Sequence, residues 1–169
     1  MEKKNDLIPI QECISKYTDD FPPYKSDYFV FCDGSGSSWN KSIGYSSIIL
    51  DCANLETYYI EGFNSFGTNN YAEILPILLS LSKINSLELL FYKSLYPPEI
   101  TILSDSLVTV NCGNGIYSTD TNNSELWAAI NYFKTKLNWK IKFIHVPRNC
   151  NEVMSYVDRG GKEKRAKEK

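Results

Sequence analysis

Three acidic residues stand where a folded chain could bring them together. Asp33 directly follows the apolar run YFVFC, Asp105 follows ITILS, and Glu73 stands at the head of ILPILLSL. A lone acid in such a place is usually a turn residue, a helix cap or part of a solvated helix face. Acids at the ends of two strands, with a third in the first turns of a helix that starts between them in sequence, favour one shared site.

The chemistry that three converging carboxylates could perform is metal binding. Like charges held close together repel and raise one another's pKa values, and a divalent cation relieves that repulsion. Carboxylate oxygens are the hard ligands that Mg²⁺ and Mn²⁺ prefer. If the two strands are neighbours, the residue types therefore predict a divalent-metal site at their ends.

The elements that must position these acids can be predicted from periodicity and turn residues. The pattern predicts strands over 27–32, 42–50, 55–63, 100–105 and 139–146, and helices over 70–90, from 106 to the glycines at 113–115, over 124–137 and over 151–158. This order is typical of an α/β fold with a mixed five-stranded sheet, three antiparallel strands followed by two parallel ones, and helices on both faces. Ligand sites in such sheets lie at the carboxyl ends of strands and at adjacent helix starts, which is where the three acids stand.

Local signals at two helices give further expectations. Asn69 or Asn70 is a good N-cap for the helix over 70–90. Pro76 should remove one backbone hydrogen bond from that helix and bend it. The helix over 124–137 is amphipathic and is expected to be capped at its start.

Chain length and composition predict one domain. At 169 residues the chain is long enough to bury a sizeable core. We expect the domain to cover residues 27–159, preceded by an N-terminal extension over 1–26 that contains a short helix over 8–17 and breaks at two consecutive prolines. The lysine-rich tail over 160–169 is polar and is expected to be disordered.

The composition argues against several classes of protein. The formal net charge is −2, so no overall basic field indicates a nucleic-acid partner, although bound cations can supply the missing positive charge. The five cysteines are odd in number and scattered, without a C-x-x-C pair, which argues against a zinc site and a disulfide framework and favours reduced thiols in a cytoplasmic protein. The chain has no run of about eighteen apolar residues, so we expect no membrane span.

Four motifs occur in a recognisable order: FCDGSG, GTNNYAEILPILLSL, ITILSDSLVTVNCGNG and FIHVPRNCNEVMSYVD. With them, the sequence resembles the ribonuclease H family, type I, over residues 27–158. The pattern T-N-N-x-x-E at the start of a helix is the most specific, and D-S after a short strand supports it. The resemblance implies a metal-dependent, endonucleolytic hydrolysis of the RNA strand of RNA/DNA hybrids with two Mg²⁺ ions, or Mn²⁺, as cofactor.

The resemblance also assigns residues. It implies that Asp33, Glu73 and Asp105 are catalytic metal ligands and that an RNA/DNA hybrid duplex is the partner. Glycine allows the backbone to come close to the sugar-phosphate chain, and the 2′-hydroxyl distinguishes RNA from DNA. The implied substrate contacts are Gly34, Ser35, Gly36, Thr68, Asn69 and Asn70.

The fourth acid of the family's pattern is missing. Counting four residues from Asn151 reaches Ser155, where the family has an aspartate. Asp158 lies three residues further, one turn along the same helix face, and is the candidate for the fourth catalytic and metal-binding acid. Otherwise the enzyme works with three carboxylates, or the chain is a catalytically impaired module of the same fold that binds nucleic acid or a partner protein. A related nuclease that acts on DNA is a weaker alternative.

Two residues near the last motif stay open. His145 is the only histidine, and a histidine at a strand end is more often a structural or surface residue, so the family's loop histidine is not assigned to it. Arg148 could touch phosphate.

Between Asp105 and the helix over 124–137 only one helix fits, so the basic handle helix of many bacterial members is expected to be absent. The sequence predicts no oligomeric state.

Overall fold

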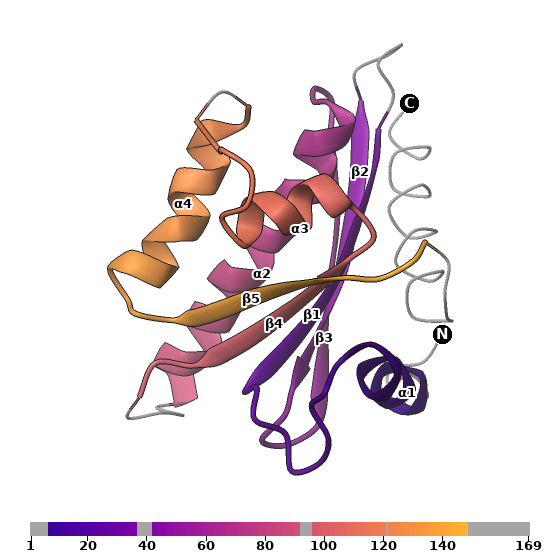
Figure 1. Cartoon of the computed structure of the whole chain (residues 1–169), viewed down its shortest axis with the longest axis vertical. Helices are drawn as coiled ribbons and strands as arrows, with labels where there is room; N and C mark the ends of the chain where they lie inside the picture. The colour runs from indigo at the N-terminus through magenta and orange to yellow at the C-terminus, as the bar shows by residue number, and fades with distance from the viewer. Residues whose placement is uncertain (1–6, 37–41, 92–95, 121, 149–169) are drawn as a thin grey trace.

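The structure of the chain, a computed structural model, describes residues 7–36, 42–91, 96–120 and 122–148. These residues form helices and strands in the predicted order (Figure 1). In chain order the elements are α1 (Leu7–Tyr17), β1 (Tyr28–Gly36), β2 (Ile43–Asp51), β3 (Glu56–Asn64), α2 (Asn69–Phe91), β4 (Glu99–Ser104), α3 (Leu107–Gly113), α4 (Ser124–Thr135) and β5 (Lys140–His145). The helix predicted over 151–158 and the tail over 160–169 lie outside the described residues.

The strands form one mixed sheet in the order β3-β2-β1-β4-β5. β2 runs antiparallel to both β1 and β3, and β4 runs parallel to both β1 and β5. The predicted sheet of three antiparallel strands followed by two parallel ones is therefore confirmed. The chain returns from β3 to β4 through α2, whose 23 residues span about 34 Å at about 1.5 Å per residue.

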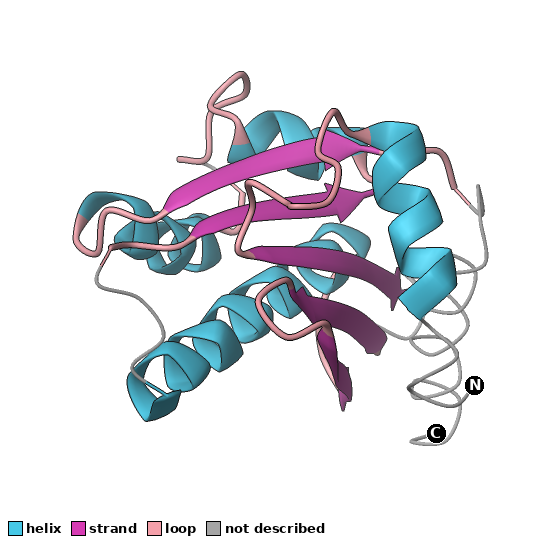
Figure 2. Cartoon of the chain, turned by 90° about the horizontal axis from the view of Figure 1, so that it is seen from below, coloured by secondary structure: helices cyan, strands magenta, loops and turns pink. Residues whose placement is uncertain are grey.

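Helices cover both faces of the sheet, as predicted (Figure 2). On one face, buried side chains of α2, α3 and α4 form the larger core cluster with alternate residues of the strands. On the other face, α1 packs against the remaining strand residues with Ile10, Cys13 and Ile14. The unbroken apolar run of β1 follows from this arrangement, because alternate side chains of a strand point to opposite faces and here both faces are buried.

β1 is longer than predicted. The apolar run predicted a strand that ends before Asp33, whereas β1 ends at Gly36 and contains Asp33. The reason is that the ladder with β2 continues to the pair of Gly36 and Ile43, and main-chain hydrogen bonds tolerate the polar residues that follow the apolar run. The parallel ladder with β4 stops earlier, at Phe31 and Leu103, so the end of β1 projects beyond β4.

Two helix starts also differ from the prediction. Thr68, and not Asn69 or Asn70, caps α2, because its hydroxyl oxygen accepts a hydrogen bond from the N–H of Tyr71 at 3.1 Å. Asn69 and Asn70 lie inside the helix with exposed side chains. α4 has no side-chain cap: Asn123 adopts a left-handed conformation with φ of 55°, and its side chain makes no capping hydrogen bond.

α2 continues through Pro76, which lies inside the helix. Ser80 Oγ donates a hydrogen bond to Pro76 O at 2.7 Å, and Ser47 Oγ of β2 lies 2.7 Å from Ser80 Oγ. These buried hydroxyl groups hold the middle of α2 against the sheet. No helix in the described part of the chain is both long enough and apolar enough to cross a membrane.

Candidate active site

Asp33 and Asp105 lie at the same end of the sheet. In the parallel ladder, Phe31 of β1 pairs with Leu103 of β4. Two further residues along each chain bring Asp33 level with Asp105. Asp33 is held in its strand by pairing with Ser46 of β2, whereas Asp105 directly follows the last residue of β4. The predicted convergence of the two strand ends is thus present in the fold.

The first turns of α2 bring Glu73 to the same place. α2 packs closely against β1 because Gly34 has no side chain: a Cβ atom there would lie 2.1 Å from Ala72 O. A Cβ atom on Gly36 would lie 2.7 Å from Asn69 Oδ1. The two glycines therefore let the helix that carries Glu73 touch the strand, a role that is separate from the predicted approach to a sugar-phosphate chain.

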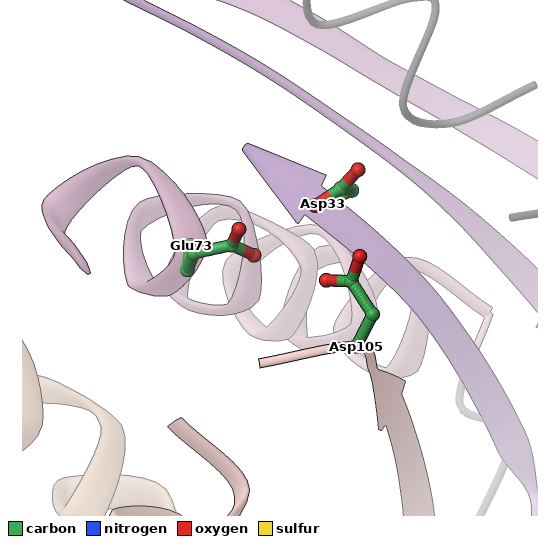
Figure 3. Close-up of side chains that lie close together, drawn as sticks. All are labelled: Asp33, Glu73 and Asp105. Carbon is green, nitrogen blue, oxygen red and sulfur yellow. The ribbon is translucent and has the colours of Figure 1, made fainter. Parts of the chain in front are cut away.

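The three carboxylates point toward one another (Figure 3). One oxygen from each of Asp33, Glu73 and Asp105 lies within 4.8 Å of the other two. Asp33 is only 1% exposed, and the side chain of Asp105 is 8% exposed. The site is therefore a small, largely buried concentration of acidic groups, contributed by β1, α2 and the residue after β4.

The burial of Glu73 and its acidic neighbours disfavour the ionised form of its carboxyl group. Burial and, to a smaller extent, the negative charge of Asp105 raise the pKa of Glu73 to about 8, from an ordinary value of 4.5. Hydrogen bonds with Asp33 and with the N–H of Gly34, together with the positive charge of Arg148, offset part of this rise in pKa. Glu73 Oε2 is buried and has no hydrogen-bond partner among the described residues. A carboxyl group with such a perturbed pKa is typical of a functional site.

A hydrogen-bond network fixes the chain on both sides of Asp105. Ser104 Oγ accepts a hydrogen bond from the N–H of Ser106 at 3.1 Å. Ser106 Oγ caps α3 by accepting from the N–H of Thr109 at 3.2 Å, and Thr109 Oγ1 donates to the same oxygen at 2.8 Å. The serine that follows the acid in the D-S motif therefore starts a helix and holds Asp105 at the strand end.

The end of β5 adds two side chains beside Asp105. Nε2 of the exposed His145 lies 3.2 Å from Asp105 O. Nε of Arg148 lies 3.8 Å from Asp105 Oδ2, and the Arg148 side chain is 63% exposed. The sequence assigned no role to His145 and suggested for Arg148 a contact with phosphate, but not this contact with Asp105. Ligand sites in such sheets lie at the carboxyl ends of neighbouring strands. Because His145 ends β5, which pairs with β4, this rule could also have predicted His145 at the site.

The donor set fits a divalent ion that prefers oxygen. Asp33, Glu73 and Asp105 offer carboxylate oxygens, the ligands that Mg²⁺ and Mn²⁺ take in proteins. The buried Glu73 Oε2 is an acceptor that a cation would satisfy. A cation would also remove the repulsion that raises the pKa of Glu73. These three residues are therefore the ones that would hold the metal.

The predicted substrate residues lie on two neighbouring segments, the end of β1 and the start of α2. The two segments meet where Asn69 Oδ1 approaches Gly36. The residues in question are Gly34, Ser35 and Gly36 in β1, Thr68 as the cap of α2, and Asn69 and Asn70 in its first turn. Their contact with nucleic acid stays a prediction, and Ser155 and Asp158 lie outside the described residues.

Comparison with known proteins finds similarity in structure. No family model matches the sequence, and no curated protein matches it. LC11-RNase H1, isolated from compost by a metagenomic approach, matches with a TM-score of 0.68 at 22% identity, covering 85% of this chain and 98% of that chain. The N-terminal ribonuclease H domain of a Mycobacterium tuberculosis protein matches with a TM-score of 0.65 at 18% identity, covering 83% and 94%.

A third neighbour is RNase H1 from the halophilic archaeon Halobacterium salinarum. Its TM-score is 0.56 at 18% identity, and the match covers 81% of this chain and 96% of that chain. At such identities the comparisons establish the fold, and function has to be argued from the site. The fold expected from the sequence motifs is confirmed. The chain is therefore a protein of the ribonuclease H-like fold, with RNase H1 enzymes among its structural neighbours.

Proposed function

We propose that this chain is a metal-dependent endoribonuclease that hydrolyses the RNA strand of RNA/DNA hybrids. The observation that carries the proposal is the convergence of Asp33, Glu73 and Asp105, with one oxygen of each within 4.8 Å of the other two. A buried cluster of three acids is unfavourable in itself, and such clusters are typical of sites that use them. LC11-RNase H1, which has a similar fold, has been solved in complex with an RNA/DNA hybrid.

The three acids have the central role in this proposal. Asp33, Glu73 and Asp105 would hold two divalent ions, Mg²⁺ or Mn²⁺. Such ions, when bound, activate water and stabilise the attacking and leaving oxygens of an in-line phosphodiester displacement. The exposed guanidinium of Arg148, beside Asp105, can pair with a phosphate group of the substrate. The acidic chain would thus approach a polyanion through the metal site and this arginine.

Recognition of RNA is assigned to the start of α2 and the end of β1. Thr68, Asn69 and Asn70 are exposed and carry hydroxyl and amide groups, which donate and accept hydrogen bonds. The 2′-hydroxyl of RNA is both a donor and an acceptor, and DNA lacks it. Because Asn69 lies against Gly36, this surface adjoins the strand that carries Asp33.

The second candidate function is a module of the same fold that binds nucleic acid or a partner protein without cleavage. The observation that favours it is Ser155, which stands where the family's pattern has its fourth acid. A serine hydroxyl brings no negative charge to a Mg²⁺ site, and ligand charge contributes to cation affinity. Binding and cleavage therefore have to be measured separately.

One assay separates these functions. The chain is incubated with labelled RNA/DNA, RNA/RNA and DNA/DNA duplexes, each with Mg²⁺, Mn²⁺ or EDTA. We expect internal cleavage of the RNA strand of the hybrid with either metal, no cleavage in EDTA, and no cleavage of the other duplexes. Fluorescence anisotropy with the same duplexes in Ca²⁺ measures binding. Saturable hybrid binding without cleavage in any metal would establish the second candidate, and cleavage of the DNA duplex would establish a nuclease of different specificity.

A further inference from the structure

The N-terminal helix α1 packs against one face of the sheet, and the strands of this face end at the candidate site. Three of its residues, Ile10, Cys13 and Ile14, are at most 1% exposed. They belong to one core cluster, the α1 cluster, with buried residues of three strands, β1, β2 and β4, and of the chain after β5. The strand and chain residues of this cluster that are fully or nearly fully buried are Phe29, Phe31, Ile48, Leu50, Leu103 and Val146.

The site acids continue the same face of the sheet. Alternate residues of a strand point to the same side. In β1, Phe29 and Phe31 pack on the side of α1, and the next residue in that series is Asp33. In β4, Leu103 packs on that side, and the next residue in its series is Asp105. Asp33 and Asp105 are therefore the next residues on this face after Phe31 and Leu103.

The α1 cluster also holds the segment that carries Arg148. Val146 is fully buried in the cluster, and its N–H donates a hydrogen bond to Ser104 O at 2.9 Å. Two residues later, Arg148 reaches Asp105. The buried residues Leu103 and Val146 thus each stand two residues before one partner of the contact between Asp105 and Arg148.

Buried hydrogen bonds tie the chain after α1 to β4. Thr18 Oγ1 donates to Ile14 O at 2.7 Å and closes the end of the helix. The carboxylate of Asp20, 6% exposed, accepts from the N–H of Ser26 at 2.9 Å. Ser26 Oγ in turn lies 2.7 Å from Thr101 Oγ1 of β4. α1 is therefore fixed relative to β4 by these bonds as well as by its apolar contacts.

We propose that α1 is a positioning element of the metal site, with Ile14 as a positioning residue that acts through Leu103 and Val146 and touches no substrate. The inference rests on the proposed function and adds to it a role for the N-terminal segment. Metal–oxygen bonds to Mg²⁺ are about 2.1 Å long and require near-octahedral geometry. A displacement of about 1 Å can cost about 100-fold in rate. The packing of α1 thus sets the separation of Asp33 and Asp105 on which the affinity for Mg²⁺ depends.

The experiment compares Ile14→Ala with Ile84→Ala as a matched control. Both residues are fully buried isoleucines in helices, so both truncations remove the same atoms from a core. Ile84 lies in α2, about three turns beyond Glu73 and in the cluster on the opposite face. The dissociation constant for Mg²⁺ is measured by isothermal titration calorimetry on metal-free protein, at a temperature where circular dichroism shows all variants folded. The rate of hybrid cleavage is then measured against Mg²⁺ concentration.

We expect Ile14→Ala to weaken Mg²⁺ binding by about 10–100-fold, as changes to the residues behind metal ligands do. Ile84→Ala should keep the wild-type affinity, and the conservative Ile14→Val should recover most of the loss. Wild-type affinity in Ile14→Ala would overturn the positioning role, and so would an equal loss in Ile84→Ala, because that result would trace the effect to stability alone.

Two further outcomes are distinguishable. If Ile14→Ala does not fold, Ile14→Val and Ile84→Val replace the two alanine variants with the same measurements and the same criteria. If the wild-type chain binds no Mg²⁺, the proposed metal site is wrong, and the positioning role falls with it. A wild-type chain that binds Mg²⁺ as tightly as both truncated variants contradicts only the inference about α1.

Discussion

Gly34 of β1 touches the backbone carbonyl group of Ala72, the residue directly before Glu73 in α2. Pro76, one turn later in the helix, has no N–H and cannot supply the usual helical hydrogen bond to this carbonyl oxygen. Both features concern the same oxygen, Ala72 O. Gly34 has no side chain to push this oxygen away, and Pro76 has no N–H to donate to it. That contact sets how closely Glu73 approaches Asp33.

Gly34→Ala tests this contact. The added Cβ atom would lie 2.1 Å from Ala72 O, so the helix has to move away from β1. We expect the free energy of unfolding to fall by about 1–3 kcal/mol, and Mg²⁺ binding to weaken because Glu73 moves with the helix. Urea unfolding and calorimetry measure the two effects. Gly115→Asn is the control, because Gly115 has φ of 78°, which asparagine tolerates, and a Cβ atom added there would meet no atom within 4 Å. Equal effects at both glycines would contradict the prediction.

Asp105→Asn keeps the shape of the side chain and removes its charge. We expect hybrid cleavage to fall by orders of magnitude while the chain stays folded. The melting temperature in EDTA should hold or rise, because the change relieves repulsion within the acidic cluster. Asp120→Asn, at an exposed acid of the loop before α4, should leave cleavage unchanged. Unchanged hydrolysis in Asp105→Asn would show that the site assignment is wrong.

The raised pKa of Glu73 predicts how the metal-free chain responds to pH. Between pH 4.5 and about pH 8, the carboxyl group of Glu73 keeps a proton in the folded chain and releases it in the unfolded chain. Folding therefore takes up a proton, and stability present below pH 4.5 is lost as the pH rises through about 8, by up to about 1.4 kcal/mol per pH unit. Urea unfolding in EDTA at several pH values should show this fall for the wild type and a flatter profile for Glu73→Gln. Parallel profiles would contradict the assignment.

The missing fourth acid is tested by Asp158→Asn and Ser155→Asp. We expect Asp158→Asn to be nearly silent, because three residues along a helix rise about 4.5 Å, which is large beside metal–oxygen bonds of about 2.1 Å. Ser155→Asp should tighten Mg²⁺ binding by adding a carboxylate oxygen. The measurement is the cleavage rate against Mg²⁺ concentration for the wild type and both variants. A large loss in Asp158→Asn without loss of folding would show that Asp158 has taken the fourth position.

The sequence predicted the elements and the three acids because those features are local. β1 and β4 show as short apolar runs, and Asp33 and Asp105 each follow one of these runs. The general rule about strand ends then brings them together without any knowledge of contacts. Glu73 stands at the head of an apolar run, and the T-N-N-x-x-E motif supported its assignment. The cap of α2 was misplaced within that motif, because Thr68, Asn69 and Asn70 are adjacent residues that all favour a cap.

The features that sequence reasoning missed depend on contacts between distant segments. The extent of β1 is set by its ladder with β2, so the polar residues after Asp33 do not end the strand. The approach of Arg148 to Asp105 requires the pairing of β4 with β5. The sequence predicted that Pro76 removes one hydrogen bond from α2, but it could not show that the carbonyl oxygen left without this donor, Ala72 O, faces Gly34 of β1. No periodicity within α1 shows that it rests on the strands of the site.

The parallel pairing of β1 with β4 has a kinetic consequence. β1, β2 and β3 are neighbours in sequence and can pair early, whereas β4 reaches β1 only after the chain has passed through β2, β3 and α2. Closing so long a loop is entropically costly, so this pairing should come late in folding. Asp33 and Asp105 remain apart until then, and an ion has nothing to bind on the way. Mg²⁺ should therefore leave the refolding rate unchanged and stabilise the chain by slowing its unfolding.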